Sequence, residues 1–146
     1  MTHLRKTLGL AEARLALDVM LAKANDMGGR PVSLVVCDDR ADVICQVSMA
    51  GVNPALARQN AFKKAYTSAS IRADTLVFGE RVKAMPSGIA SFGNPNFFVG
   101  GGGAVIVTND GTILGGLGVS GRTAEEDEEI VQAGKASLTA TINAIP

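Results

Sequence analysis

The sequence predicts an α+β fold in which helices flank one antiparallel sheet. Apolar, β-branched runs occur in groups joined by short turns, and helical patterns precede, separate and follow these groups. Because short hairpins join the strands within each group, the sheet is expected to be antiparallel rather than parallel and doubly wound. The expected order is helix, two strands, two helices, three strands and helix, which gives a five-stranded sheet.

The first helix is expected from Leu8 to Met27. Apolar residues recur there at the three-and-four spacing of one helical face, and Gly28-Gly29 ends the pattern. Two strand-like runs follow, V-S-L-V-V-C after Pro31 and V-I-C-Q-V-S-M after Asp42. They are predicted to pair as an antiparallel hairpin.

Asn53-Pro54 predicts the start of the next helix, because a side-chain cap is followed by a proline at the first helical position. This helix is expected to run to about Ser70. One of its faces carries only small residues, which would let it approach the sheet closely: Ala57, Ala61, Ala65, Ser68 and Ala69. Asp74-Thr75 predicts the cap of a further short helix, from Leu76 to about Lys83.

The clearest structural signal lies between Asn96 and Gly121. Ala104–Thr108 and Thr112–Ser120 are strand-like, and Asn109-Asp110-Gly111 between them suits a tight hairpin. The many glycines here weaken a strand, so something must gain from the missing side chains. Two interpretations are open: the sheet bends at these glycines, or another element or a ligand approaches the backbone closely.

Thr123-Ala124-Glu125-Glu126 is a capping box and predicts the start of the last helix. The buried stripe of this helix is expected to be Ile130, Gly134, Leu138 and Ile142. No repeat or linker interrupts the chain, so residues 1–146 are expected to form one domain. The order of elements suits a profilin-like or PAS-like arrangement.

The composition excludes several classes of partner. With 14 basic and 14 acidic residues the formal net charge is zero, so nucleic acid is not an expected partner. The apolar runs are too short to span a membrane, and the N-terminus lacks the apolar region of a signal peptide. We therefore expect a cytoplasmic protein, without membrane association, in which Cys37 and Cys45 are reduced, buried thiols.

Several motifs occur together: V-V-C-D up to Asp38, Ala61-x-x-Lys64-Ala65 followed by Thr75, the glycine run, D-G-T-I-L-G-G-L-G-V-S-G, and Asp127. Over about residues 8 to 140 they resemble the GlcG/HbpS haem-binding family, which includes the C-terminal domain of PduO-type corrinoid adenosyltransferases. The resemblance implies a profilin-like fold, homo-oligomers from dimers to octamers, and haem or another tetrapyrrole as cofactor. It also implies a link to diol, glycerol or glycolate utilisation.

The chain departs from this family at the expected haem ligand. Haem-binding members of the PduO branch use a histidine of the first helix, whereas the only histidine here is His3, in the N-terminal segment. His3 could ligate iron in the pocket of a neighbouring chain, or it could simply be solvated. Tyr66, Met20 and Met49 are axial-ligand candidates by chemistry alone, and core packing is the alternative for each. The usual glycine of the first hairpin turn is Ala41.

We therefore expect a small-molecule-binding or accessory protein with no catalytic residues and no metal site. Its ligand would be an amphipathic molecule with carboxylates, such as a tetrapyrrole, in a cleft between the sheet, the Asn53–Ser70 helix and the glycine hairpin. The expected ligand contacts are His3, Arg58, Lys64, Thr75, Gly100, Gly101, Gly102 and Gly103. For Lys64, a surface position or an interface ion pair is the alternative interpretation.

Two other functions remain open. The first is an enzyme acting on a small organic acid or carbonyl compound, with Lys64 and Asp38 or Asp127 as acid–base groups. The second is a non-catalytic structural partner in a metabolic complex. Val119–Arg122 precedes a helix N-terminus that could hold an anion, but the acidic residues that follow favour helix capping alone.

Overall fold

The computed structural model describes residues 1–143 and contains a four-stranded antiparallel sheet with helices on both faces. The elements are α1 (Leu10–Met27), β1 (Ser33–Asp38), β2 (Val43–Ser48), η1 (Pro54–Arg58), α2 (Gln59–Ile71), α3 (Thr75–Lys83), η2 (Gly88–Phe92), β3 (Gly103–Val107), β4 (Ile113–Ser120) and α4 (Ala124–Asn143). The expected α+β class is confirmed. None of these helices is long and apolar enough to cross a membrane.

The strands lie in the order β2-β1-β4-β3, and each neighbouring pair is antiparallel. The expected hairpins, β1 with β2 and β3 with β4, are both present. The pairing of β1 with β4 joins strands that are far apart in the sequence, with Ser33 opposite Ser120. The start of β1 and the end of β4 therefore meet at one end of the sheet.

The sheet has four strands in the described part of the chain, not the five that we expected. The segment 97–102 forms no strand because several of its N–H groups donate to side chains and to the start of α3 instead of to a neighbouring strand. Phe98 N–H donates to Thr67 Oγ1 (2.8 Å), and Gly100 N–H donates to the Thr75 carbonyl (3.3 Å). Gly100 and Gly102 have φ values of +103° and +112°, which are incompatible with an extended strand.

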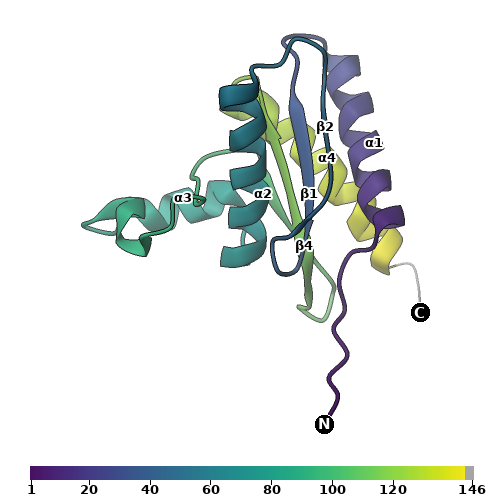
Figure 1. Cartoon of the computed structure of the whole chain (residues 1–146), viewed down its shortest axis with the longest axis vertical. Helices are drawn as coiled ribbons and strands as arrows, with labels where there is room; N and C mark the ends of the chain where they lie inside the picture. The colour runs from purple at the N-terminus through teal and green to yellow at the C-terminus, as the bar shows by residue number, and fades with distance from the viewer. Residues whose placement is uncertain (144–146) are drawn as a thin grey trace.

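Helices α1 and α4 cover one face of the sheet, and α2 covers the other (Figure 1). The core beneath α1 and α4 is built from large apolar side chains, including Met20, Leu117 and Ile130. The core beneath α2 is built mainly from small ones, because Ala61 and Ala65 face β1 there. The core layer beneath α2 is therefore thinner than the layer beneath α1 and α4.

Glycines in β4 allow α2 to lie almost directly on the sheet. A Cβ atom at Gly118 would overlap the Ala61 carbonyl oxygen, and one at Gly116 would lie 2.5 Å from the Ala65 carbonyl oxygen. Ordinary contacts of a Cβ atom are about 3.5–4 Å. Of the two interpretations of the glycine-rich stretch, close approach by another element is therefore the one that the structure shows at these positions.

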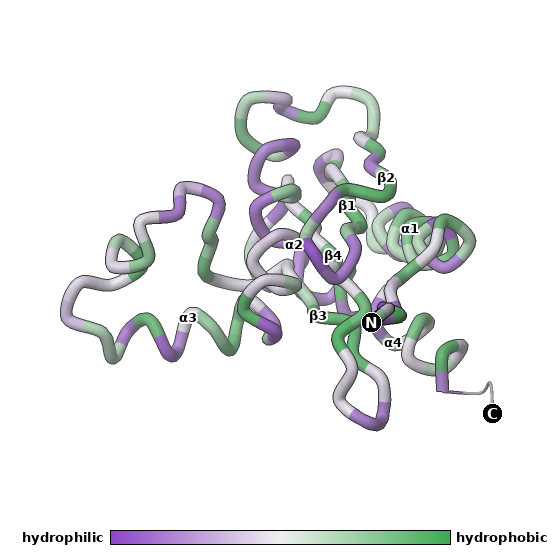
Figure 2. Tube along the Cα trace, turned by 60° about the horizontal axis from the view of Figure 1, so that its bottom comes forward, coloured by the Kyte–Doolittle hydropathy of each residue, from purple (hydrophilic) through white to green (hydrophobic). Residues whose placement is uncertain are grey.

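Helix α3 and η2 form an arm, residues 75–95, that stands away from the sheet (Figure 1; Figure 2). Phe78 is buried at its base and contacts the ring of Phe92, at a centroid distance of 5.5 Å. Leu76, Val77 and Phe92 are exposed apolar side chains of this arm. The arm thus presents apolar surface outside the core of the chain.

Two local signals of the sequence are also found. The Thr123 hydroxyl accepts a hydrogen bond from Glu126 N–H (3.2 Å), as expected for the cap of α4. Ala41, in the first hairpin turn, has φ +66°, a left-handed conformation that favours glycine. Cys37 is a buried free thiol, whereas Cys45 is free and only half-buried.

Candidate functional site

A cleft of about 570 Å³ opens at the end of the sheet where β1 begins and β4 ends. Five parts of the chain line it: the loop after α1, the segment around η1, α2, residues 98–101, and the start of α4 with the residues before it. This is close to the position that we expected, between the sheet, the helix that follows Asn53 and the glycine segment.

The cleft is positively charged although the chain as a whole is neutral. Arg30, Lys64 and Arg122 line it together with a single acidic residue, Asp127, so the lining carries a formal charge of +2. We refer to this site as the cationic cleft. A site with this balance attracts anions such as carboxylates and phosphates.

Lys64 projects from α2 toward the N-terminal turn of α4. Its Nζ atom donates to the Val119 carbonyl (2.8 Å) and to Asp127 Oδ2 (3.1 Å), and it lies 5.3 Å from the centre of the Phe98 ring. Burial lowers the pKa of Lys64, and the neighbouring Asp127 partly opposes that shift. Lys64 is therefore not a surface lysine, but one half of a buried ion pair.

Asp127 is the other half of this pair. Its Oδ1 atom accepts a hydrogen bond from the Arg122 backbone N–H (3.1 Å), which fixes the carboxylate at the start of α4. Burial raises the pKa of Asp127, and the charge of Lys64 partly opposes that shift. Desolvation thus favours the neutral form of both partners, and their mutual attraction favours the charged forms.

Arg122 joins the cleft to the end of α1. Its Nε atom donates to the Arg30 carbonyl (2.6 Å) and its Nη2 atom to the Ala24 carbonyl (3.0 Å). Within residues 1–143, its Nη1 atom has no hydrogen-bond partner and no carboxylate forms a salt bridge with it. The Arg30 and Ala24 carbonyl oxygens and the negative end of the α1 dipole face this buried positive charge.

The glycine segment is split between the cleft and the interior. Gly100 and Gly101 line the cleft. Gly102 N–H donates to Glu128 Oε1 (3.0 Å) and Gly103 N–H to Thr75 Oγ1 (2.9 Å), so these two amides are used within the protein. A Cβ atom at Gly102 would lie 2.8 Å from Lys64 Nζ, so the glycine leaves room for the lysine to reach its partner.

The remaining expected contacts lie outside the cationic cleft. Thr75 is buried behind the glycine segment, where its hydroxyl bonds to Gly103. Arg58 is exposed at the end of η1 and does not line the cleft. His3 is exposed in the segment before α1, which runs past the opposite end of the sheet, where Thr7 donates to the Leu114 carbonyl (3.3 Å).

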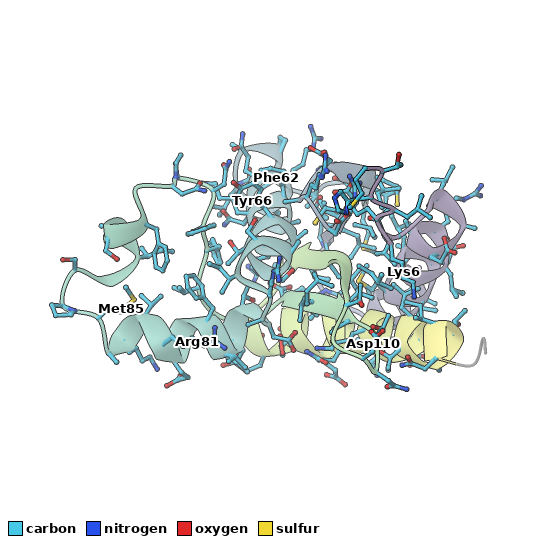
Figure 3. The ribbon with its side chains drawn as sticks, turned by 90° about the horizontal axis from the view of Figure 1, so that it is seen from below. Lys6, Phe62, Tyr66, Arg81, Met85 and Asp110 are labelled. Atoms are coloured by element: carbon cyan, nitrogen blue, oxygen red, sulfur yellow. The ribbon has the colours of Figure 1, made fainter. Side chains whose placement is uncertain are left out.

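The candidate axial ligands also lie elsewhere. Tyr66 stands beside Phe62 on α2 (Figure 3), and its hydroxyl accepts a hydrogen bond from Asn94 Nδ2 (3.0 Å). Met20 is fully buried in the core, and Met49 Sδ accepts from Val32 N–H (3.4 Å). Among residues 1–143, no His, Cys, Met or Tyr lines the cleft, so the side chains that commonly ligate haem iron are absent from it.

Comparison with known proteins gives one family match and several similar structures. The family model described as "Haem degrading protein HbpS-like" matches residues 8–136, which confirms the resemblance. ORFY from Klebsiella pneumoniae superposes with a TM-score of 0.84 at 21% identity, over 95% of this chain and 95% of that one. A PduOC:haem complex gives 0.78 at 24% identity, over 90% and 94%.

A double mutant of HbpS from Streptomyces reticuli superposes with a TM-score of 0.81 at 25% identity, over 92% of this chain and 89% of that one. These proteins share the fold over nearly their whole lengths. A search of curated proteins by sequence finds no match.

Proposed function

The chain belongs to the HbpS-like haem-degrading family, and we propose that it binds an organic anion of the tetrapyrrole class in the cationic cleft. The observation that carries the proposal is the charge of the lining, in which three cationic side chains accompany one carboxylate. A ligand carboxylate would compensate the excess positive charge, most of all that of Arg122, which forms no salt bridge within residues 1–143.

The cleft also has an apolar side. Leu56, Phe98 and Val99 line it, and Leu56 is 59% exposed. Covering an exposed leucine contributes about 1–2 kcal/mol to binding before the costs of association. A ligand that combines an apolar body with carboxylates matches both sides of the site, and a tetrapyrrole is such a molecule.

Iron ligation by this chain does not fit the cleft, because the lining contains none of the usual axial ligands. We therefore propose that the carboxylates of the ligand, rather than a metal ion, determine binding. Arg30 and Arg122 are the proposed partners of these carboxylates, with the backbone of Gly100 and Gly101 beside them. An iron-free porphyrin should then bind about as well as hemin.

Absorbance titrations with hemin and with iron-free protoporphyrin IX test this proposal. We expect one saturable site per chain and similar affinities for the two compounds. Arg30→Glu, which reverses a charge in the cleft, should weaken both about tenfold, because the interaction lost is of order 1 kcal/mol. Arg58→Glu is the matched control, since it makes the same change at an exposed arginine outside the cleft, and it should leave both affinities unchanged.

Two results would contradict the proposal. Binding of hemin without binding of protoporphyrin IX would show that iron is ligated, and loss of that binding in His3→Ala would assign the ligand to the N-terminal segment. A flat response to both compounds would favour the non-catalytic structural partner over a binding protein.

We also propose that the single domain works as a homo-oligomer, between dimer and octamer, with an accessory role in diol, glycerol or glycolate utilisation. Support for self-association comes from the exposed apolar side chains of the arm, Leu76, Val77 and Phe92. Apolar side chains gathered on a projecting segment are typical of surfaces that another protein covers.

A further inference from the structure

Lys64 is the feature of the cleft that anion binding leaves unexplained. Its side chain is 5% exposed, and its charge is already paired with Asp127 at 3.1 Å, so it has little charge to offer a ligand carboxylate. A buried ion pair contributes little stability compared with apolar side chains of similar volume. Neither stability nor anion binding therefore explains why a primary amine occupies this position.

The surroundings of Lys64 favour amine chemistry. A lysine is a nucleophile only as the neutral amine, and removal from water favours that form. Asp127 Oδ2, at 3.1 Å from Nζ, can accept the proton within the pair without the help of solvent. The Phe98 ring, with its centre 5.3 Å from Nζ, covers the amine on another side.

We propose that Lys64 forms an imine with an oxo acid, a molecule that carries both a carbonyl group and a carboxylate, in the cationic cleft. The inference rests on the proposed function in one respect, because the carboxylate of the oxo acid is attracted by Arg30 and Arg122 as any organic anion would be. It goes beyond that function in assigning a covalent step to the cleft.

The step is balanced without an oxidant or reductant. The Lys64 ammonium passes one proton to Asp127, and the free amine attacks the carbonyl carbon, so that a carbon–nitrogen bond forms while the π electron pair moves to oxygen. A second proton of the nitrogen moves to that oxygen, and the proton held by Asp127 joins the leaving hydroxide. One water departs, and a protonated imine remains beside the regenerated Asp127 carboxylate.

The amine and its proton acceptor belong to two separate helices. Lys64 lies on α2, and Asp127 is fixed at the start of α4 by the Arg122 backbone N–H, at 3.1 Å. The missing side chain at Gly102 leaves space for Nζ between them. This geometry places the amine and its proton acceptor in the wall of the same cleft as the arginines.

Reductive trapping tests the inference on the full-length protein. The protein is incubated with phenylpyruvate, which combines a ketone, a carboxylate and an apolar ring, in the presence of sodium cyanoborohydride, which converts an imine into a stable secondary amine. Peptide mass spectrometry then measures the extent of labelling at every lysine. We expect Lys64 to be labelled about tenfold or more above Lys63 and Lys83, because the bound carbonyl is held beside its amine.

Two controls separate the cleft from general lysine reactivity. Phenylacetone, the ketone without the carboxylate, should label Lys64 much less than phenylpyruvate does. Arg30→Glu should lower Lys64 labelling about fivefold and leave that of Lys83, which is 75% exposed, unchanged. The double variant Lys64→Met with Asp127→Asn removes the amine without leaving an unpaired charge. It is therefore expected to fold and serves as the control that cannot be labelled at position 64.

Labelling spread evenly over the exposed lysines, or confined to Lys83 and Lys63, would overturn the inference, and the buried pair would then be purely structural. The outcome is independent of the porphyrin titrations. Trapping at Lys64 without porphyrin binding would support imine formation and reject the tetrapyrrole class. Porphyrin binding without trapping would support the tetrapyrrole class and reject imine formation.

Discussion

Substitution of Gly118 by alanine is the most demanding test of how α2 sits on the sheet. The new methyl group would overlap the Ala61 carbonyl oxygen and would lie 2.7 Å from Ala65 N and 3.0 Å from Ala61 C. The obstructing atoms belong to the helix backbone, so no change of side-chain rotamer can relieve the overlap. Helix α2 would have to move away from β4 by roughly 1.5–2 Å to restore ordinary contacts of about 3.5–4 Å.

The expected cost follows from that displacement. Overpacking a core typically costs about 1–3 kcal/mol, and here a whole helix also loses its fit against the sheet. We therefore expect Gly118→Ala to lower the free energy of unfolding by about 3 kcal/mol or more. Because Lys64 lies on α2, the same movement would lengthen its contact with Asp127 and weaken the proposed ligand binding in the cleft.

Urea unfolding followed by circular dichroism measures this cost. Gly88→Ala is the control for a methyl group that meets no atom within 4 Å; its φ of +57° gives it a backbone cost of about 1 kcal/mol, which Gly118, whose φ is not positive, does not share. A Gly118→Ala protein as stable as the Gly88→Ala protein would refute the close approach of α2 to β4.

Three further predictions concern the buried thiol, the ion pair and the arm. Burial raises the pKa of Cys37 from 9.0 to about 12. The stabilisation from its retained proton is therefore complete below pH 9 and declines above it, so wild type should lose about 2 kcal/mol relative to Cys37→Ala between about pH 8 and 10.5. Parallel stability profiles of these two proteins would contradict this. Lys64→Met should cost about 3–5 kcal/mol in urea unfolding because it leaves the Asp127 carboxylate unpaired, and adding Asp127→Asn should recover most of that loss. A double variant no more stable than the single one would argue against the pair. Phe92→Asp should reduce the mass measured by light scattering if the arm joins the chains, and an unchanged mass would exclude the arm from the interface.

Features that depend on nearby residues were predictable from the sequence. The cap at Thr123, the hairpin turn at Gly111 and the ends of the helices follow from local propensity and spacing. The fit of a small-residue helix face against a glycine-rich strand was also predictable in kind, because Ala61 and Ala65 leave room that only a close partner can fill. Their register on Gly118 was not, since it depends on packing between distant segments.

The absence of a fifth strand and the composition of the cleft could not be predicted from neighbouring residues. The segment around Phe98 has strand-like residues, but its backbone N–H groups donate hydrogen bonds to Thr67 and Thr75, which are distant in the sequence. Arg122 reaches the cleft only because the end of α1 lies beside the end of β4, 92 to 98 residues away in the sequence. The sequence carries no local signal for such long-range contacts, so it pointed to Lys64 but not to Arg122, although both line the cleft.

We propose above that the cationic cleft recognises carboxylates. The most direct test is to titrate the wild-type protein with protoporphyrin IX and with its dimethyl ester, in the same solvent and at the same ionic strength. The two compounds share the ring and differ in the two carboxylates. Saturable binding of the acid with little or no binding of the ester is the predicted result, and equal binding of both would contradict the claim.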